Sequence, residues 1–156
     1  VAAECAIPRR YMDDLIAGFA LDADGWRPQS EADLLRYCYH VAGAVGCMMA
    51  IVMGVSPDDD ATLDRACDLG LAFQLGNISR DIAEDAAADR CYLPVDWLVE
   101  MGIDPADPLA LQTRPQLAIL AQRLPALAAP YEESARFGTP ALPFRSAWAW
   151  LTAAGI

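Results

Sequence analysis

The chain has 156 residues, of which 55% are hydrophobic, and it carries a formal net charge of −11. A chain of this length forms one domain and buries about two-thirds of the surface of its unfolded state, so a hydrophobic core is expected. The acidic balance makes nucleic acid and anionic membrane surfaces poor partners, and it would repel a diphosphate ligand unless divalent cations bridged the two.

The cysteines indicate a reducing compartment. They are odd in number, form no C-x-x-C pair, and comprise Cys5, Cys38, Cys47, Cys67 and Cys91. We interpret them as reduced, mostly buried thiols of a cytosolic protein without a zinc site. No signal peptide is present, and the uncharged run 41–55 is too short for a membrane span and is predicted to be a buried helix.

The first predicted helix begins at Pro8. Tyr11, Leu15 and Phe19 then recur every four residues, as they do on one face of a helix. Asp13 and Asp14 are adjacent and therefore point in different directions, so we expect two surface carboxylates and no paired-carboxylate site.

The second predicted helix runs from the N-cap Ser30 to about Met53, and Gly54 ends it. One face repeats every four residues and carries Tyr37, Val41, Val45 and Met49. From spacing alone such a stripe belongs either to the core or to a pocket. The only histidine, His40, has no second ligand at metal-binding spacing, so we expect a single hydrogen bond on a helix face.

The third predicted helix spans about 61–88 and holds the most informative pattern. Four polar residues fall within an arc of roughly 80° on this helix, namely Gln74, Asn77, Asp81 and Asp85. Apolar residues lie beside them, at Leu71, Leu75, Ile78 and Ile82. Oxygen ligands in such a row can hold Mg²⁺ and leave coordination sites for phosphate oxygens, although a solvated acidic face has the same spacing. Arg80 could pair with Glu84 or with a diphosphate oxygen.

The rest of the chain is also predicted to be helical. A short helix begins at Pro94 and ends at Gly102, and a capping box at 113–116 starts a long helix with a kink near Pro125 or Pro130. A last helix is predicted from Thr139. No segment alternates as a strand does, so the fold class is all-α.

Two sequence blocks are specific to a known family. The block Asn77-x-x-Arg80-Asp81-x-x-Glu84-Asp85, followed by Arg90-x-Tyr92-Leu93-Pro94, closely resembles the second aspartate-rich motif of the squalene/phytoene synthase family. A second block, 37–46, also resembles that family. The first aspartate-rich motif, which lies N-terminal in the family, has no counterpart here. With a start at Val1 and an end at Ile156, we therefore expect one partial domain over 1–156, either a fragment or a processed or trimmed chain.

The resemblance implies the isoprenoid synthase fold, in which antiparallel helices surround a central cavity. It also implies a prenyltransferase that condenses two geranylgeranyl diphosphates to phytoene through a cyclopropylcarbinyl diphosphate, in carotenoid biosynthesis. The blocks are more similar to phytoene synthase than to squalene synthase, so NADPH is not expected. The alternatives are a squalene or dehydrosqualene synthase that uses farnesyl diphosphate, or a non-catalytic assembly protein. Because one motif is missing, we expect this chain alone to be inactive.

The resemblance assigns roles to the candidate site residues. Mg²⁺ or Mn²⁺ would be held by Asn77, Asp81 and Asp85. Arg80 and Tyr37 would contact the diphosphate and act in catalysis with the two aspartates. The substrate-binding set adds Gln74, Asp22, Val41, Val45, Leu71, Phe73 and Leu75. The expected partner is a prenyl diphosphate, with no nucleic acid, and the expected location is the cytoplasm with at most peripheral membrane association. The oligomeric state cannot be predicted.

Overall fold

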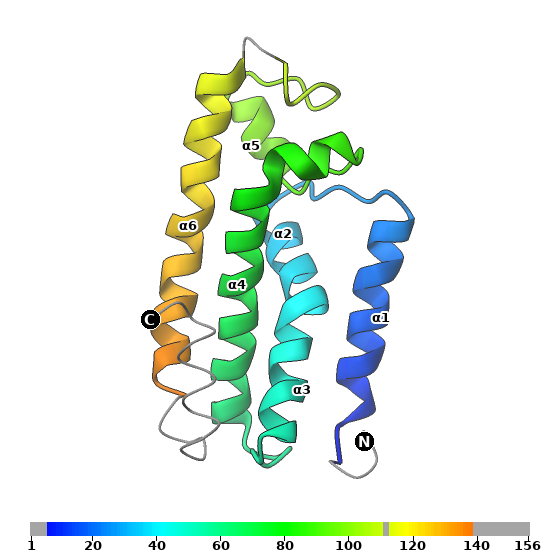
Figure 1. The fold of residues 1–156 in the computed structure, drawn as a ribbon, viewed down its shortest axis with the longest axis vertical. Helices are drawn as coiled ribbons and strands as arrows, with labels where there is room; N and C mark the ends of the chain where they lie inside the picture. Colours follow the sequence, from blue (N-terminus) through cyan, green and yellow to red (C-terminus); the bar gives the residue numbers. More distant parts are fainter. Residues whose placement is uncertain (1–5, 111–112, 139–156) are drawn as a thin grey trace.

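The computed structural model describes residues 6–110 and 113–138, and this part of the chain is helical and contains no strand. Its elements are α1 (Arg9–Ala23), α2 (Glu31–Cys38), the π-helical turn η1 (Tyr39–Gly43), α3 (Ala44–Val52), α4 (Asp60–Ala87), α5 (Val95–Glu100) and α6 (Arg114–Arg136). Figure 1 shows α1, the α2–η1–α3 run, α4 and α6 as antiparallel neighbours. The all-α prediction is confirmed; the helix predicted from Thr139 lies outside the described residues.

The predicted start of α2 is confirmed by its capping geometry. The Ser30 hydroxyl accepts a hydrogen bond from the backbone N–H of Asp33 at 3.3 Å, and the Asp33 carboxylate accepts one from the N–H of Ser30 at 3.2 Å. The capping box predicted at 113–116 is wrong, because the Thr113 side chain makes no cap. Its hydroxyl instead donates to the carbonyl of Ala110 at 2.7 Å.

The second predicted helix is interrupted by the π-helical turn η1. A stripe that repeats every four residues drifts by about 40° per turn around an α-helix of 3.6 residues per turn. A π-helical turn is wider and offsets part of this drift. Tyr37 is therefore buried and lines a polar pocket that is described below. Val41 and Val45 line an apolar groove, also described below.

The run Glu31–Val52 is long and apolar enough to cross a membrane, judged by length and composition alone. In the fold it packs between α1 and α4, and it buries residues along its whole length, from Leu34 to Ile51. The run 41–55, predicted as a buried helix, is buried only in part, because Cys47 and Ile51 face the core whereas Met49 and Val52 are exposed.

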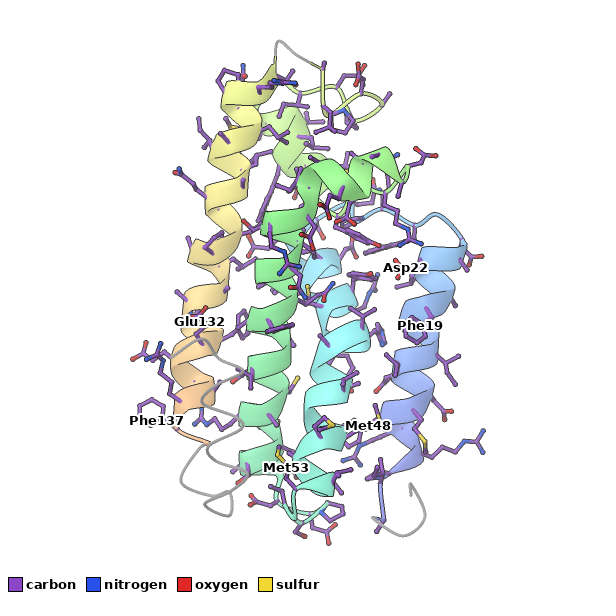
Figure 2. The ribbon with its side chains drawn as sticks, in the orientation of Figure 1. Phe19, Asp22, Met48, Met53, Glu132 and Phe137 are labelled. Carbon is purple, nitrogen blue, oxygen red and sulfur yellow. The ribbon has the colours of Figure 1, made fainter. Side chains whose placement is uncertain are left out.

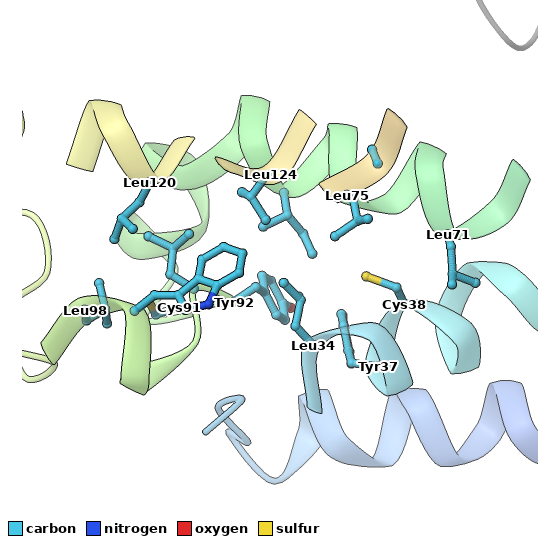
Figure 3. Packing of buried hydrophobic residues seen from close by; sticks show 14 of the residues in the cluster. Leu34, Tyr37, Cys38, Leu71, Leu75, Cys91, Tyr92, Leu98, Leu120 and Leu124 are labelled. Carbon is cyan, nitrogen blue, oxygen red and sulfur yellow. The ribbon is translucent and has the colours of Figure 1, made fainter. Parts of the chain in front are cut away.

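Two hydrophobic clusters hold the helices together. The larger cluster joins α2, α4, α5 and α6, and Figure 3 shows Leu71 and Leu75 of α4 directed toward Leu34 and Cys38 of α2. The smaller cluster joins α1, α3 and the first part of α4 around residues such as Tyr11 and Leu63. Leu34 of α2, Leu75 of α4 and Leu124 of α6 are fully buried. Because α4 contacts α2, η1, α3 and α6, it is the central helix of the bundle.

Asp14 is not the free surface carboxylate that the sequence predicts. It accepts a hydrogen bond from the Tyr39 hydroxyl at 2.6 Å, and His40 Nδ1 lies 3.8 Å from its other oxygen. Its neighbour Asp13 is exposed and pairs with Arg9. Asp14 thus connects α1 to η1 by a polar contact.

The helix α6 continues through both prolines. Proline has no N–H, so Pro125 cannot bond to the carbonyl of Ala121 one turn earlier. That carbonyl instead accepts a hydrogen bond from the Ser79 hydroxyl of α4 at 2.9 Å. The contact supplies the missing donor and fixes α4 against α6.

This contact predicts a coupled pair of substitutions. Ser79→Ala should lower the free energy of unfolding by about 1 kcal/mol, because it removes a half-buried donor and leaves the Ala121 carbonyl unpaired. In a Pro125→Ala background the backbone N–H of residue 125 can take over, and the cost of Ser79→Ala should fall. Urea denaturation of the four variants measures the coupling. Equal costs in both backgrounds would show that Ser79 does not compensate for Pro125.

Candidate functional site

A polar pocket of about 260 Å³ lies where the C-terminal end of α1, the C-terminal end of α2 and the last turns of α4 meet. In Figure 1 these last turns of α4 bend away from the axis of the rest of the helix, and Figure 2 shows Asp22 at the adjoining end of α1. The pocket is lined by Asp22, Tyr37, Gln74, Asn77, Ile78, Arg80, Asp81, Asp85, Arg90 and Tyr92. The structure therefore places the predicted polar row in one pocket with Asp22 and Tyr37.

Asp22 is held by two tyrosine hydroxyls from distant parts of the chain. Tyr37 donates to it at 3.0 Å and Tyr92 donates at 2.9 Å. The two tyrosine rings stack with centroids 4.9 Å apart, and Trp26 stacks on the other face of Tyr37 at 5.6 Å. Burial raises the pKa of Tyr37 far above its ordinary value, so this hydroxyl stays a hydrogen-bond donor at all physiological pH values. The aromatic stack gives the pocket a rigid wall.

The end of α4 explains how Tyr92 and Arg90 reach the pocket. Asp89 adopts a left-handed conformation with φ of 58°, and the N–H of Arg90 donates to the carbonyl of Asp85 at 2.9 Å. This is the helix-ending arrangement in which a left-handed residue reverses the chain. The reversed chain returns past the pocket, and Tyr92 is buried there.

Arg80 is paired with its neighbour Asp81 and not with Glu84. Two parallel hydrogen bonds of 2.6 Å join the guanidinium to the two carboxylate oxygens. They hold the pKa of Asp81 below its ordinary value. The pair is exposed, with 70% of the Arg80 side chain accessible, so it is readily exchanged for other partners.

The pKa of Asp85 is shifted in the opposite direction to that of Asp81. Burial raises the pKa of its carboxyl group, and the negative charge of Asp81 raises it further, while Arg90 acts in the other direction. A carboxylate in this state gains stability from a nearby cation. Asp85 is thus the member of the row that most needs a positive partner.

The donor set of the pocket fits a magnesium ion with an incomplete protein shell. Carboxylate and amide oxygens of Asp81, Asp85 and Asn77 line the same space, and such hard oxygen ligands suit Mg²⁺. Within 6–110 and 113–138, no three His, Cys, Asp or Glu side chains form a closed metal cage. A Mg²⁺ ion at this place would therefore be held by only one or two carboxylates, with waters and phosphate oxygens as its other ligands.

An apolar groove of about 460 Å³ continues from the polar pocket between α3 and α4. Gln74 and Asn77 line both spaces and mark the junction. The remaining lining residues are Val41, Ala42, Val45, Gly46, Met49, Met53, Ala66, Leu69, Gly70 and Phe73. Figure 2 shows Met53 at the end of the bundle opposite Asp22, so the groove runs away from the polar pocket.

The predicted wall residues divide into two groups. Val41, Val45 and Phe73 line the groove, and Phe73 is 56% exposed beside it. Leu71 and Leu75 do not line it, which corrects their expected place; they are buried in the core between α4 and α2 (Figure 3). Their side of α4 faces α2, whereas Phe73 and Gly70 lie about a quarter turn or more away, on the groove side.

Sequence reasoning left two polar pocket residues out of the candidate set. Tyr92 and Arg90 belong to the quoted block 90–94, but they follow the end of α4, where helical periodicity gives no information. Their even spacing within Arg90-x-Tyr92 was the available signal, because residues two apart in an extended segment point the same way.

Comparison with known proteins agrees with this geometry. The squalene/phytoene synthase family model matches residues 1–156. The chain belongs to the squalene/phytoene synthase family. It is 58% identical to the 15-cis-phytoene synthase of Enterobacter agglomerans over 92% of this chain, and 54% identical to the phytoene synthase of Pseudescherichia vulneris over 96%. These matches cover 48% and 47% of the relatives, so the chain spans about half the length of these curated relatives.

Solved structures confirm the isoprenoid synthase fold for this part of the family. A dehydrosqualene synthase crystallised with a ligand superposes with a TM-score of 0.80 at 31% identity. The match covers 94% of this chain and 51% of that protein. The helices described above are therefore one portion of that larger helical fold.

The raised pKa of Asp85 predicts how stability depends on pH and magnesium. Below the ordinary aspartate pKa near 4 the carboxyl is protonated in both the folded and the unfolded state. As the pH rises, the Asp85 carboxyl loses its proton at a higher pH in the folded state than in the unfolded state. The free energy of unfolding therefore falls between the two pKa values and stays lower above the folded-state pKa. At pH 7 without metal, the unfolding midpoint of Asp85→Asn should therefore be the same as that of the unsubstituted protein or higher. Mg²⁺ should stabilise the variant less than it stabilises the unsubstituted protein.

Thermal unfolding at pH 4 and pH 7, with and without Mg²⁺, measures both effects. Asp13→Asn provides the control, because Asp13 is an exposed aspartate outside the pocket. A lower midpoint for Asp85→Asn at pH 7 without metal would contradict the electrostatic assignment.

Proposed function

We propose that the protein to which this chain belongs is a phytoene synthase that joins two geranylgeranyl diphosphates head to head through a cyclopropylcarbinyl diphosphate. The observation that supports this most directly is the junction at Gln74 and Asn77, where a polar, oxygen-rich pocket meets an apolar groove. A ligand with an anionic head and a long hydrocarbon tail matches both spaces. The identity to curated phytoene synthases favours the C₂₀ substrate.

The polar pocket provides the groups that a diphosphate requires. Asn77, Asp81 and Asp85 would hold Mg²⁺, or Mn²⁺, and when bound this ion neutralises the diphosphate and makes it a better leaving group. Arg80 and Arg90 line the same pocket and would supply positive charge to the departing oxygens. Tyr37 and Tyr92 remain protonated donors and keep Asp22 in place. We assign the catalytic role to this group of side chains.

The apolar groove would hold the prenyl tail and exclude water. The carbocation formed when diphosphate leaves is quenched by water, so the reacting carbons need a dry surface. Val41, Val45 and Phe73 offer such a surface next to the polar junction. This chain covers only 51% of the solved dehydrosqualene synthase, and we propose that the rest of the full-length protein closes the groove.

Two other functions deserve a direct test. A squalene or dehydrosqualene synthase would use farnesyl diphosphate on the same scaffold, and the similarity to a dehydrosqualene synthase favours testing it. A non-catalytic assembly protein would need no metal row, and the retained Asn77, Asp81 and Asp85 argue against it. We further propose a cytoplasmic enzyme, with at most peripheral membrane association, that needs no NADPH.

The deciding experiment assays the full-length protein with geranylgeranyl and farnesyl diphosphates across a Mg²⁺ titration. We expect phytoene from geranylgeranyl diphosphate without NADPH. Asp81→Asn and Asp85→Asn should each lower turnover by about two orders of magnitude, because the diphosphate loses the charge that assists its departure. Asp13→Asn should leave turnover unchanged. Product only from farnesyl diphosphate would favour the dehydrosqualene alternative, and no product from either would favour the non-catalytic one.

Val45→Phe tests the path of the tail. Val45 is half-buried and lines the groove, so a phenyl ring there should shorten the space for the tail and favour farnesyl over geranylgeranyl diphosphate. Competition between the two substrates, measured with product chromatography, gives the preference. An unchanged preference, together with a stability loss of about 1–3 kcal/mol from overpacking, would place Val45 in the core instead.

A further inference from the structure

Two cysteines face each other across the contact between α3 and α4. Cys47 belongs to α3 and is 3% exposed, and Cys67 belongs to α4 and is half-buried. Cys47 belongs to the smaller hydrophobic cluster, and Cys67 packs against both clusters. Neither residue lines the polar pocket or the apolar groove.

Each of the two sulfur atoms contacts the helix that carries the other cysteine. The Cys47 Sγ donates to the carbonyl of Leu63 at 3.5 Å, and Leu63 lies one turn before Cys67 on α4. A Cβ built on Gly43 would lie 2.9 Å from the Cys67 Sγ, and Gly43 lies one turn before Cys47. Each sulfur therefore reaches the opposite helix about one turn from the other cysteine, and both occupy the same seam.

The backbones at this seam are unusually close. A Cβ built on Gly46 would lie 2.2 Å from the Ala66 carbonyl oxygen and 3.6 Å from the Cys67 backbone nitrogen. Gly46 directly precedes Cys47, and Ala66 directly precedes Cys67. A disulfide requires Cα atoms within about 4.4–6.8 Å, a distance that ordinary helix pairs at 8–10 Å rarely allow without small residues.

The surroundings also prepare the thiols for oxidation. Hydrogen bonds from the Cys67 thiol and from Tyr11 lower the pKa of Cys47, whereas the same thiol contact and burial raise the pKa of Cys67. Thiolate character is what makes a cysteine reactive toward peroxides. Cys38 is the matched contrast, because burial raises its pKa to about 12. Cys67 also lines a second, separate pocket with Asp64, Arg65 and Asp68, through which a small oxidant reaches Cys67 and the Cys47 thiol that contacts it.

We propose that Cys47 and Cys67 are a redox-active dithiol that closes to a disulfide between α3 and α4 when the protein meets a peroxide. The Cys47 sulfur attacks hydrogen peroxide and becomes a sulfenic acid, and the O–O bond breaks to release hydroxide. The hydroxide takes up the proton that Cys47 lost, which gives the first water. The Cys67 sulfur then attacks the sulfenic sulfur, and the sulfenic oxygen leaves with the Cys67 proton as the second water. Two thiols and one peroxide thus give one disulfide and two waters.

The disulfide would act on the apolar groove without occupying it. Gly46 and Ala66 line the groove, so a bond between the residues that follow them fixes the separation of α3 and α4 at that point. A metal site is a poor alternative for these thiols, because no third His, Cys, Asp or Glu joins them in the described parts of the chain. The proposal is independent of the substrate proposed above.

The test treats the reduced, full-length protein with hydrogen peroxide, blocks the remaining thiols with N-ethylmaleimide, and maps peptides without reductant. Trypsin cuts after Arg36, Arg65 and Arg80, so Cys38 and Cys47 share the peptide 37–65 while Cys67 lies in 66–80. The digest is therefore done in a Cys38→Ala background. We expect one species that joins the two peptides and disappears with dithiothreitol.

Matched variants decide the result. Cys47→Ala and Cys67→Ala should each abolish the cross-linked species, Cys91→Ala should retain it, and circular dichroism confirms that each variant is folded. The oxidised protein should lose two titratable thiols and unfold at a higher temperature than the reduced protein, because the cross-link restricts the unfolded state. Oxidation that stops at sulfinic acid, or that cross-links other cysteines, would overturn the proposal.

Discussion

Backbone contact between the η1–α3 run and α4 is the constraint on which the rest of the structure depends. A Cβ built on Gly46 would lie 2.2 Å from the Ala66 carbonyl oxygen, and one built on Gly70 would lie 2.3 Å from the Ala42 carbonyl oxygen. These are distances that a real side chain cannot occupy. Gly46, Ala66 and Gly70 belong to this close contact, and they also line the apolar groove. The groove therefore lies along the line where the two backbones touch.

The polar pocket combines carboxylates in two different physical states. Asp22 is fixed by two tyrosine hydroxyls and an aromatic stack, so its position is independent of any ligand. Asp81 and Asp85 lie on the last turns of α4, where an exposed arginine pair and a raised pKa make their state sensitive to added cations. A rigid wall opposite a responsive one suits a site that must hold an ion only together with its anionic ligand.

Local pattern was sufficient to predict the helices and the polar face of α4, but contacts between helices were not predictable. Gln74 to Asp85 share a pocket because one continuous helix carries them, and helical geometry fixes their spacing. Periodicity places Leu75 and Phe73 on opposite sides of the polar row. It could not tell that the side of Leu75 faces the core and the side of Phe73 faces the groove. The Ser79 contact with Ala121 depends on a proline 46 residues away in another helix, and no spacing rule connects them. Tyr92 reaches the pocket only through the chain reversal at Asp89.

The charges of the pocket connect cation binding to anion binding. Without a metal, Arg80 is held by Asp81, and Arg90 interacts with Asp85, so the positive charges are partly neutralised. A divalent ion on the two aspartates competes with both arginines, since a carboxylate shares its charge among its partners. The guanidinium groups would then have fewer internal partners, and the proposed diphosphate would take the place of the aspartates as their anionic partner. In a chain of net charge −11, such an exchange is how the proposed diphosphate would be held despite the negative charge of the protein.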